Sequence, residues 1–224
     1  MLAGYIDSTN LKADAQEQDI KLLCEQAARH KMAAVCVNPY RLPLAAECLT
    51  SSEVKLCTVI GFPLGAEHSS TKLYAARLAL QQGAQELDLV MNIGAFLERN
   101  YHHIRAEIKS LLILKNDYDF ALKVIVETAM LSEVELRQAT ELVSNTQADF
   151  IKTSTGYASR GVSLKDIEII NVYKCKNLKI KASGGIKDLD FALQLIAAGV
   201  DRIGSSNALH LLEEYSQRGG LEGR

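Results

Sequence analysis

Residues 149–185 read DFIKTSTGYASRGVSLKDIEIINVYKCKNLKIKASGG. A short apolar run at 149–153 leads through a Gly/Ser-rich loop into a segment of helical period at 163–173. A second short apolar run follows at 179–182. Two strand candidates joined by a helix predict a βαβ crossover, which makes the two strands parallel neighbours in one sheet.

The same alternation extends over the whole chain, with a helix candidate after each strand candidate. The predicted strands are 4–6, 33–37, 55–61, 86–91, 121–126, 149–153, 179–182 and 202–204. The clearest predicted helices are 69–82, 98–115, 132–145, 163–173 and 189–198. This repetition predicts an α/β fold, a single-domain (β/α)8 TIM barrel over residues 1–218, with a C-terminal tail at 219–224.

A doubly wound open sheet is the competing architecture. It usually carries a glycine-rich turn after its first strand, because a nucleotide phosphate approaches the backbone there. The corresponding residues here are Asp7-Ser8-Thr9-Asn10, which contain no glycine. The barrel is therefore the favoured prediction.

Composition limits the classes of partner. The 224 residues carry 25 Lys plus Arg against 27 Asp plus Glu, a net charge of −2. Neither a nucleic-acid partner nor a polybasic membrane contact is expected from this balance. The five cysteines form no C-x-x-C pair, the start of the chain lacks a signal-peptide pattern, and no apolar stretch approaches the ~18 residues of a membrane span. We expect a cytoplasmic protein that acts on a small molecule.

Catalytic residues of a barrel lie at the carboxyl ends of its strands and in the loops that follow. Side chains alternate between the two faces of a strand, so Leu87 and Leu89 facing the helices would point Asp88 inward. The same alternation points Lys181 inward, and Lys152 lies on the sixth predicted strand. Two lysines and one carboxylate in a buried interior favour an amine nucleophile, because burial and a second cation both disfavour the charged amine. A purely structural buried ion pair is the alternative.

Glycine-rich loops after the last two predicted strands indicate phosphate binding. They read Ser183-Gly184-Gly185-Ile186 and Gly204-Ser205-Ser206-Asn207, and each precedes a helix. Backbone N–H groups in such loops approach an anion closely, and the loops after strands seven and eight are the usual phosphate site of these barrels. Gly156 supplies a third close approach. Ordinary turn glycines are the alternative.

Three other features are less informative. The histidines lack the spacing of a zinc site, so no metal is expected. Cys36 ends an apolar strand and is interpreted as a small core residue. Lys123 shares a strand face with Glu127, and the pattern leaves open whether it serves the site or closes the bottom of the barrel.

Eight motifs together resemble the deoxyribose-phosphate aldolases, a family of class I (Schiff-base) aldolases. In chain order they are IDSTNLK at 6–12, VCVNP at 35–39, VIGFPLG at 59–65, ELDLVMN at 86–92, KVIVET at 123–128, FIKTSTG at 150–156, KASGGI at 181–186 and RIGSS at 202–206. The resemblance runs from the first strand to the last. The sixth and seventh motifs are highly specific as a pair.

The resemblance implies reversible cleavage of 2-deoxy-D-ribose 5-phosphate to D-glyceraldehyde 3-phosphate and acetaldehyde, with no cofactor. By this analogy Lys152 forms the Schiff base, Lys181 remains charged beside it, and Asp88 joins Lys181 in a proton relay. The implied phosphate-binding residues are Gly156, Gly184, Gly185, Ser205 and Ser206. Asp7 and Thr9 would orient sugar hydroxyls or the catalytic network. A homodimer is expected from the family.

The chain departs from the family pattern at Ser8, where many members carry histidine, and at Tyr157, where some carry a lysine near the phosphate. Phosphate binding would then depend more on backbone amides. The functional C-terminal tyrosine of some members is not transferred to Tyr215, which lies in the last predicted helical segment. Three alternative functions remain: another Schiff-base barrel, a sugar-phosphate isomerase or epimerase, and a non-catalytic sugar-phosphate-binding barrel.

Overall fold

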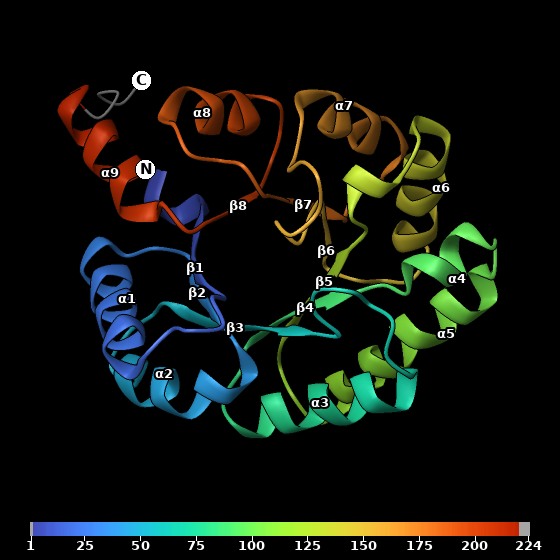
Figure 1. Cartoon of the computed structure of the whole chain (residues 1–224), viewed down its shortest axis with the longest axis horizontal. Coiled ribbons are helices and arrows are strands. Elements are labelled where there is room, and N and C mark those ends of the chain that lie inside the picture. The colour runs from blue at the N-terminus through green and yellow to red at the C-terminus, as the bar shows by residue number, and fades with distance from the viewer. Residues whose placement is uncertain (1, 220–224) are drawn as a thin grey trace.

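The computed structural model of the chain describes residues 2–219, which form a closed parallel barrel surrounded by helices (Figure 1). The strands are β1 (Ile6–Asn10), β2 (Ala34–Val37), β3 (Lys55–Ile60), β4 (Glu86–Val90), β5 (Ala121–Ile125), β6 (Phe150–Lys152), β7 (Lys179–Ser183) and β8 (Arg202–Ser205). They pair in sequence order, and β1 pairs with β8 through the register Asp7↔Gly204. This closure confirms the barrel and rules out the open sheet.

The helices form the outer ring of the barrel (Figure 1). They are α1 (Glu17–His30), α2 (Leu42–Leu49), α3 (Ser69–Gln81), α4 (Ile93–Leu97), α5 (Tyr101–Leu112), α6 (Glu133–Ser144), α7 (Leu164–Tyr173), α8 (Leu189–Ala197) and α9 (Ala208–Gln217). Short 3-10 segments occur at Leu2–Tyr5, Pro39–Arg41, Ile113–Asn116 and Thr128–Met130. None of the helices within residues 2–219 is both long and apolar enough to cross a membrane.

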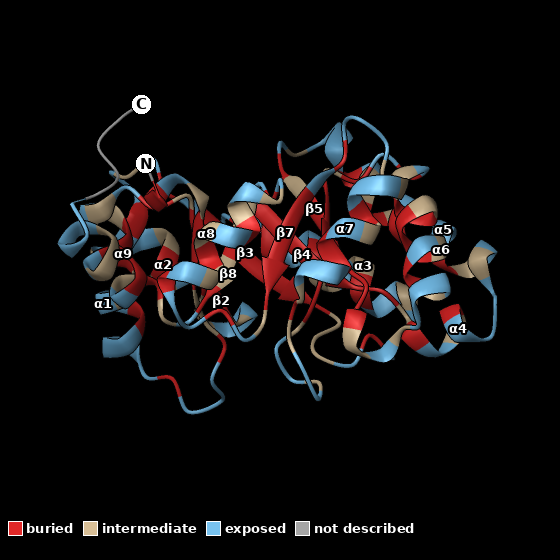
Figure 2. Cartoon of the chain, turned by 90° about the horizontal axis from the view of Figure 1, so that it is seen from above, coloured by how far each residue is buried: buried red, intermediate tan, exposed pale blue. Residues whose placement is uncertain are grey.

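Two distinct environments lie on the two faces of the barrel wall. The outward faces of the strands pack apolar side chains against the helices, and Leu87, Leu89, Ile180 and Ala182 are all fully buried there. Figure 2 shows the strands almost entirely buried and the helices exposed mainly on their outer faces. The inward faces of β2 and β3 form a separate small apolar cluster that contains Cys36. Buried charged side chains, together with Phe150, occupy much of the rest of the interior.

The first strand was predicted wrongly at 4–6. Residues Leu2–Tyr5 form a 3-10 helix that packs against α9 and β8, and the strand begins at Ile6. The prediction relied on runs of apolar residues, and it misplaced this strand because Asp7, Ser8 and Thr9 are polar. Their backbone is nevertheless extended, since it pairs with β2 on one side and β8 on the other.

The helix predicted at 98–115 corresponds to α5 and begins three residues too early, because a break at residues 99–100 separates α4 from α5. Arg99 adopts a left-handed conformation with φ of 61°, and Asn100 caps α5 by accepting a hydrogen bond from the backbone N–H of His103 at 3.2 Å. An asparagine at this position is an N-cap signal that competes with helix continuation. The other predicted helices agree with the structure to within one residue at each end.

Helix starts are well defined next to the loop that follows β6. Ser163 and Asp166 form a capping box at the start of α7, in which each side chain accepts a hydrogen bond from the other residue's backbone N–H. Such a cap satisfies N–H groups that the first turn of a helix leaves free. It also fixes the end of the loop of residues 153–163, which forms one wall of the candidate site.

Candidate active site

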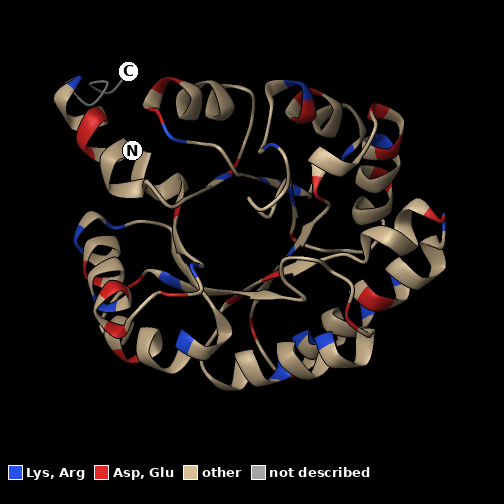
Figure 3. Ribbon diagram, viewed as in Figure 1, with Lys and Arg blue, Asp and Glu red and all other residues tan. Residues whose placement is uncertain are grey.

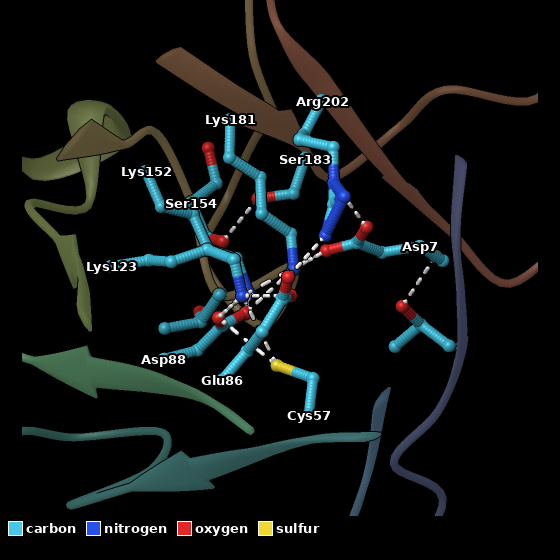
Figure 4. A network of polar contacts seen from close by, with 12 residues as sticks. Asp7, Cys57, Glu86, Asp88, Lys123, Lys152, Ser154, Lys181, Ser183 and Arg202 are labelled. Carbon is cyan, nitrogen blue, oxygen red and sulfur yellow. Dashed lines mark hydrogen bonds and ion pairs between the residues drawn. The ribbon is translucent and has the colours of Figure 1, made fainter. Parts of the chain in front are cut away.

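A cluster of buried charges occupies the interior of the barrel. Figure 3 shows acidic and basic residues on the inner ring of strands, and Figure 4 shows the side chains converging. The members come from six strands and are Asp7, Glu86, Asp88, Lys123, Lys152, Lys181 and Arg202. Charges buried at this depth are costly unless they are paired. The cluster therefore has to be explained by its pairing or by its chemistry.

Asp88 lies at the centre of the cluster and uses both carboxylate oxygens (Figure 4). Its Oδ2 accepts hydrogen bonds from Lys152 Nζ at 2.7 Å and from Lys181 Nζ at 2.8 Å. Its Oδ1 accepts from Lys123 Nζ at 2.8 Å and from Cys57 Sγ at 3.2 Å. The structure thus confirms that the side chains of Asp88, Lys152 and Lys181 point into the barrel, as predicted.

The three lysines differ in how fully they are paired. Lys123 contacts three carboxylates, at 2.6 Å from Glu86, 2.8 Å from Asp88 and 4.0 Å from Asp7. Lys181 contacts two, at 2.6 Å from Asp7 and 2.8 Å from Asp88. Lys152 contacts Asp88 alone among the residues that the structure describes. Lys152 is also the one of these three that lines the cavity above the cluster.

Protonation of the cluster follows from burial and pairing. Burial alone would raise the pKa of Asp88, but Lys123, Lys152 and Lys181 outweigh it and hold that pKa well below the ordinary value. Burial would lower the pKa of Lys181, but Asp7 and Asp88 reverse this and raise it. The pKa of Lys123 is raised in the same way, chiefly by Asp88 against burial. Lys181 and Lys123 are therefore charged, as Asp88 is.

An open cavity of about 450 Å³ lies above the charge cluster, at the carboxyl ends of the strands. Its wall includes Lys152 and the loops after β1, β6, β7 and β8. Gly156, Gly184 and Gly185 line it with φ values of 90°, 82° and 76°. Their backbone N–H groups, and that of Ser206, make no hydrogen bond to any other residue in the range 2–219. Free N–H groups on left-handed glycines are typical of an anion site.

Backbone hydrogen bonds join the loop after β6 to the loop after β7. Val162 N–H donates to the carbonyl oxygens of Ser183 and Gly184, both at 3.2 Å. A Cβ atom on Gly161 would lie 1.9 Å from the Gly184 carbonyl oxygen, so a side chain has no room there. The two loops that carry Gly156, Gly184 and Gly185 therefore form one continuous wall.

Six of the seven predicted substrate-binding residues line the cavity: Thr9, Gly156, Gly184, Gly185, Ser205 and Ser206. The seventh, Asp7, does not line it. Asp7 is fully buried beneath the floor, where it pairs with Lys181 at 2.6 Å and with Arg202 Nε at 2.9 Å. Asp7 therefore contacts the charge cluster and not the cavity, and both of its expected roles stay predictions.

Several residues of the site were not identified from the sequence. Arg202 donates to Asp7 and, at 2.5 Å, to Glu86, and so bridges two carboxylates of the cluster. Glu86 lies two residues before Asp88, so strand alternation could have identified it. Arg202 is the β8 register partner of Lys181, a relation that appears only once the strands are aligned. Lys12 and Lys187 line the cavity from exposed loops.

Tyr157 is one of the family departures, and it forms part of the cavity rim. Its hydroxyl donates to the Leu11 carbonyl oxygen at 3.1 Å, and its ring meets Phe62 edge-on with centroids 5.4 Å apart. It thus joins the loop after β6 to the loop after β1. The other departure, Ser8, is buried in β1, and the structure assigns it no contact with the cavity.

Cys36, Cys57 and Asp88 offer side-chain atoms that lie within 4.8 Å of one another, close enough to hold a metal ion. The Lys123 ammonium, however, lies 3.3 Å from Cys57 Sγ and 2.8 Å from Asp88 Oδ1. Its positive charge already compensates these ligands, and a dication at the same place would be repelled by it. The arrangement therefore favours an amine-based site over a metal site.

Comparisons with known proteins agree with this geometry. Residues 1–217 match the model of the DeoC/LacD family aldolases. The deoxyribose-phosphate aldolase of Mycoplasmoides pirum is 48% identical over 94% of this chain and 96% of that protein, and the one of Thermococcus kodakarensis is 41% identical over 95% and 96%.

Solved structures show the same relationship. "QR15, an Aldolase" superposes with a TM-score of 0.93 at 40% identity, covering 99% of each chain. The deoxyribose-phosphate aldolase of Aeropyrum pernix, described as tetrameric, gives a TM-score of 0.89 at 31% identity, covering 97% of this chain and 92% of that one. The chain therefore belongs to the DeoC/LacD family of aldolases, together with the deoxyribose-phosphate aldolases.

Proposed function

We propose that this aldolase cleaves 2-deoxy-D-ribose 5-phosphate reversibly to D-glyceraldehyde 3-phosphate and acetaldehyde, through a Schiff base on Lys152. The observation that carries the assignment of the nucleophile is the unequal pairing of the lysines. Lys152 alone of the three lines the cavity, and it has one carboxylate partner where Lys181 has two and Lys123 has three.

Charge balance within the cluster distinguishes Lys152 from the other cationic groups. Across the described residues, three carboxylates (Asp7, Glu86 and Asp88) face four cationic groups (Lys123, Lys152, Lys181 and Arg202). The excess is one positive charge, and it disappears when Lys152 loses a proton. An amine must be neutral to attack a carbonyl, so the least paired lysine is also the one best suited to the reaction.

The reaction follows from imine chemistry. The Lys152 amine adds to the C1 aldehyde of the open-chain sugar, and loss of water gives a protonated imine. The C2–C3 bond then breaks as the C3 hydroxyl loses its proton, so that C3 becomes the aldehyde carbon of D-glyceraldehyde 3-phosphate, which leaves. The electron pair of the broken bond passes through C2 into the iminium to give an enamine. Protonation of C2 and hydrolysis release acetaldehyde and regenerate the amine.

Proton transfer is assigned to Asp88 and Lys181. Both Lys152 and Lys181 donate to the same Asp88 oxygen, at 2.7 and 2.8 Å, so a proton can pass along a short path between the lysines. General acid–base assistance of this kind contributes about 10²- to 10⁴-fold. Asp7 and Arg202 hold Lys181 and its partners in place from below.

The substrate phosphate is assigned to the free N–H groups of Gly156, Gly184, Gly185 and Ser206, with the hydroxyls of Thr9, Ser205 and Ser206 nearby. Ser205 Oγ already donates to the Ile186 carbonyl oxygen at 3.0 Å, so Ser205 contributes mainly by shaping the loop. Binding energy from a remote group positions the reacting carbon, an effect worth up to ~7–11 kcal/mol in favourable cases.

Membership of an aldolase family disfavours the isomerase and the non-catalytic binding protein as alternatives, because neither requires an imine-forming lysine. A cytoplasmic location and a homodimer remain predictions. The relative from Aeropyrum pernix is described as a tetramer, so sedimentation equilibrium is the measurement that decides the assembly of this chain.

Borohydride trapping with acetaldehyde, followed by peptide mass spectrometry, tests the proposal. An ethyl adduct on Lys152 is expected, and Lys152→Arg, which keeps the cation beside Asp88, should form no adduct and show no turnover. Lys179→Arg is a matched control, because Lys179 is an exposed lysine on the strand that carries Lys181. An adduct on Lys181 would reverse the two roles, and turnover by Lys152→Arg would exclude the Schiff base at Lys152.

A further inference from the structure

The loop after β6 is held by Glu127, a residue that follows β5 and does not line the cavity. Glu127 Oε2 accepts hydrogen bonds from the Thr155 N–H at 3.0 Å and from the Thr155 hydroxyl. The same hydroxyl accepts from the Tyr157 N–H at 3.1 Å. Thr155, Gly156 and Tyr157 all line the cavity. This hydrogen-bonded chain therefore fixes the residues on both sides of Gly156.

The residue after Glu127 fixes both ends of the same loop. Thr128 N–H donates to the Thr153 carbonyl oxygen at 2.8 Å. The Thr128 carbonyl oxygen accepts from Arg160 Nη2 at 3.0 Å, and its hydroxyl donates to Asp166 at 2.9 Å. The loop from 153 to 161 is thus anchored at its start, its middle and its end by one short segment.

Glu127 has two features that are unfavourable for stability. Its backbone is left-handed, with φ 55° and ψ 71°, a conformation that residues other than glycine rarely adopt. Its side chain is buried, and Oε1 has no hydrogen-bond partner among residues 2–219. Strain and an unsatisfied buried oxygen at one residue indicate a role in function, because neither improves folding.

We propose that Glu127 is a positioning residue that sets the preference of the enzyme for a phosphorylated substrate. It orients Thr155 and thereby aims the Gly156 N–H at the phosphate. This inference rests on the proposed function, because it requires that the phosphate bind at Gly156. The predicted consequence is selective: loss of Glu127 weakens catalysis on phosphorylated substrates more than on those without phosphate.

The experiment compares cleavage of 2-deoxyribose 5-phosphate with cleavage of 2-deoxyribose, for the wild type, Glu127→Ala and Glu127→Gln. The readout is the ratio of kcat/KM for the two substrates. Glu127→Ala should lower this ratio, mainly through a higher KM for the phosphorylated sugar, by up to about 100-fold. Glu127→Gln should largely restore it, because its side-chain carbonyl oxygen accepts the same two hydrogen bonds.

Thr155→Val and Thr155→Ser test the same contact from the other side. Thr155→Val removes the hydroxyl and should lower the ratio, whereas Thr155→Ser retains it. In the double variant of Glu127→Ala and Thr155→Val, the combined loss should be smaller than the sum of the two, because both variants remove the hydrogen bond between the Thr155 hydroxyl and Glu127. These Thr155 variants also keep the inference testable if Glu127→Ala does not fold, which circular dichroism would show.

A merely structural Glu127 gives a different result. Equal losses on both substrates, an unchanged ratio, or Glu127→Gln as impaired as Glu127→Ala would each overturn the inference. Failure of the proposed function would appear in the wild type, as absence of cleavage of 2-deoxyribose 5-phosphate. Failure of the inference would appear only in the variants.

Discussion

Asp88 accepts hydrogen bonds from three ammonium groups and one thiol, which occupy about all the acceptor positions that a carboxylate offers. No acceptor position remains for a substrate hydroxyl while all four donors are in place. In the proposed mechanism, a proton from the substrate would therefore reach Asp88 only after one donor has changed its own protonation or moved away. Formation of the imine on Lys152 is such a change, since it reduces the number of N–H groups on that nitrogen.

Asp88→Asn should therefore be costly to both folding and catalysis. The amide cannot compensate the ammonium groups of Lys123, Lys152 and Lys181, and breaking a buried ion pair costs about 3–5 kcal/mol. Urea unfolding should show a large loss of stability, and cleavage of 2-deoxyribose 5-phosphate should be lost. Asp190→Asn is the control, because Asp190 pairs with Arg218 on the surface. Full activity of Asp88→Asn would exclude Asp88 from the relay.

At this scale, strand alternation predicted the orientation of the three proposed catalytic side chains. Asp88, Lys152 and Lys181 lie inside the barrel because apolar neighbours on the same strands face the helices. The sequence pattern could not predict which residues of neighbouring strands lie beside each other. The bridge from Arg202 to Asp7 joins residues 195 positions apart, and it depends on the register of β8 with its neighbours. The role of Lys123 was open for the same reason, since it depends on which acids β4 places beside it.

At the scale of elements, strand positions were predictable where the strand is apolar. β4 and β5 were placed nearly correctly, because their outward faces are continuous apolar surface. β1 was misplaced, because its residues after Ile6 are polar and its extended backbone depends on pairing with β2 and β8. The break between α4 and α5 depends on the single cap at Asn100, which helical periodicity alone does not reveal.

Gly161→Ala tests the contact between the loops after β6 and β7. The added Cβ would overlap the Gly184 carbonyl oxygen, which belongs to the backbone and cannot rotate away as a flexible side chain could. We expect a loss of about 1–3 kcal/mol in stability and a higher KM for 2-deoxyribose 5-phosphate. Thermal unfolding and steady-state kinetics measure these effects. Gly4→Ala is the matched control, because a Cβ there meets nothing within 4 Å, and equal behaviour of both variants would contradict the expectation.

At the scale of the whole molecule, the buried cluster makes the stability of the barrel depend on pH. The pKa values of Asp7 and Asp88 lie below the ordinary 3.8, so their contribution is present above that value and is lost as pH falls through the lowered pKa. The pKa values of Lys123 and Lys181 lie above the ordinary 10.5, so their contribution is present below that value and is lost only as pH rises through the raised pKa.

The free energy of unfolding should therefore change little, as far as this cluster is concerned, between about pH 5 and pH 9, and should fall below about pH 4. Urea unfolding across this range measures it. Asp7→Asn should make the fall in acid shallower, because one of the two groups that take up protons is missing. A fall that is just as steep in Asp7→Asn would assign the acid sensitivity to other carboxylates.

The proposed phosphate cradle consists mainly of main-chain N–H groups, on Gly156, Gly184, Gly185 and Ser206. Most substitutions of these glycines should impair phosphate binding, because each glycine has a backbone conformation that other residues rarely adopt. Directed evolution toward sugars without phosphate is thus better aimed at exposed side chains on the rim. Lys12 and Lys187 provide such positions, where new contacts can be added while the cradle stays intact.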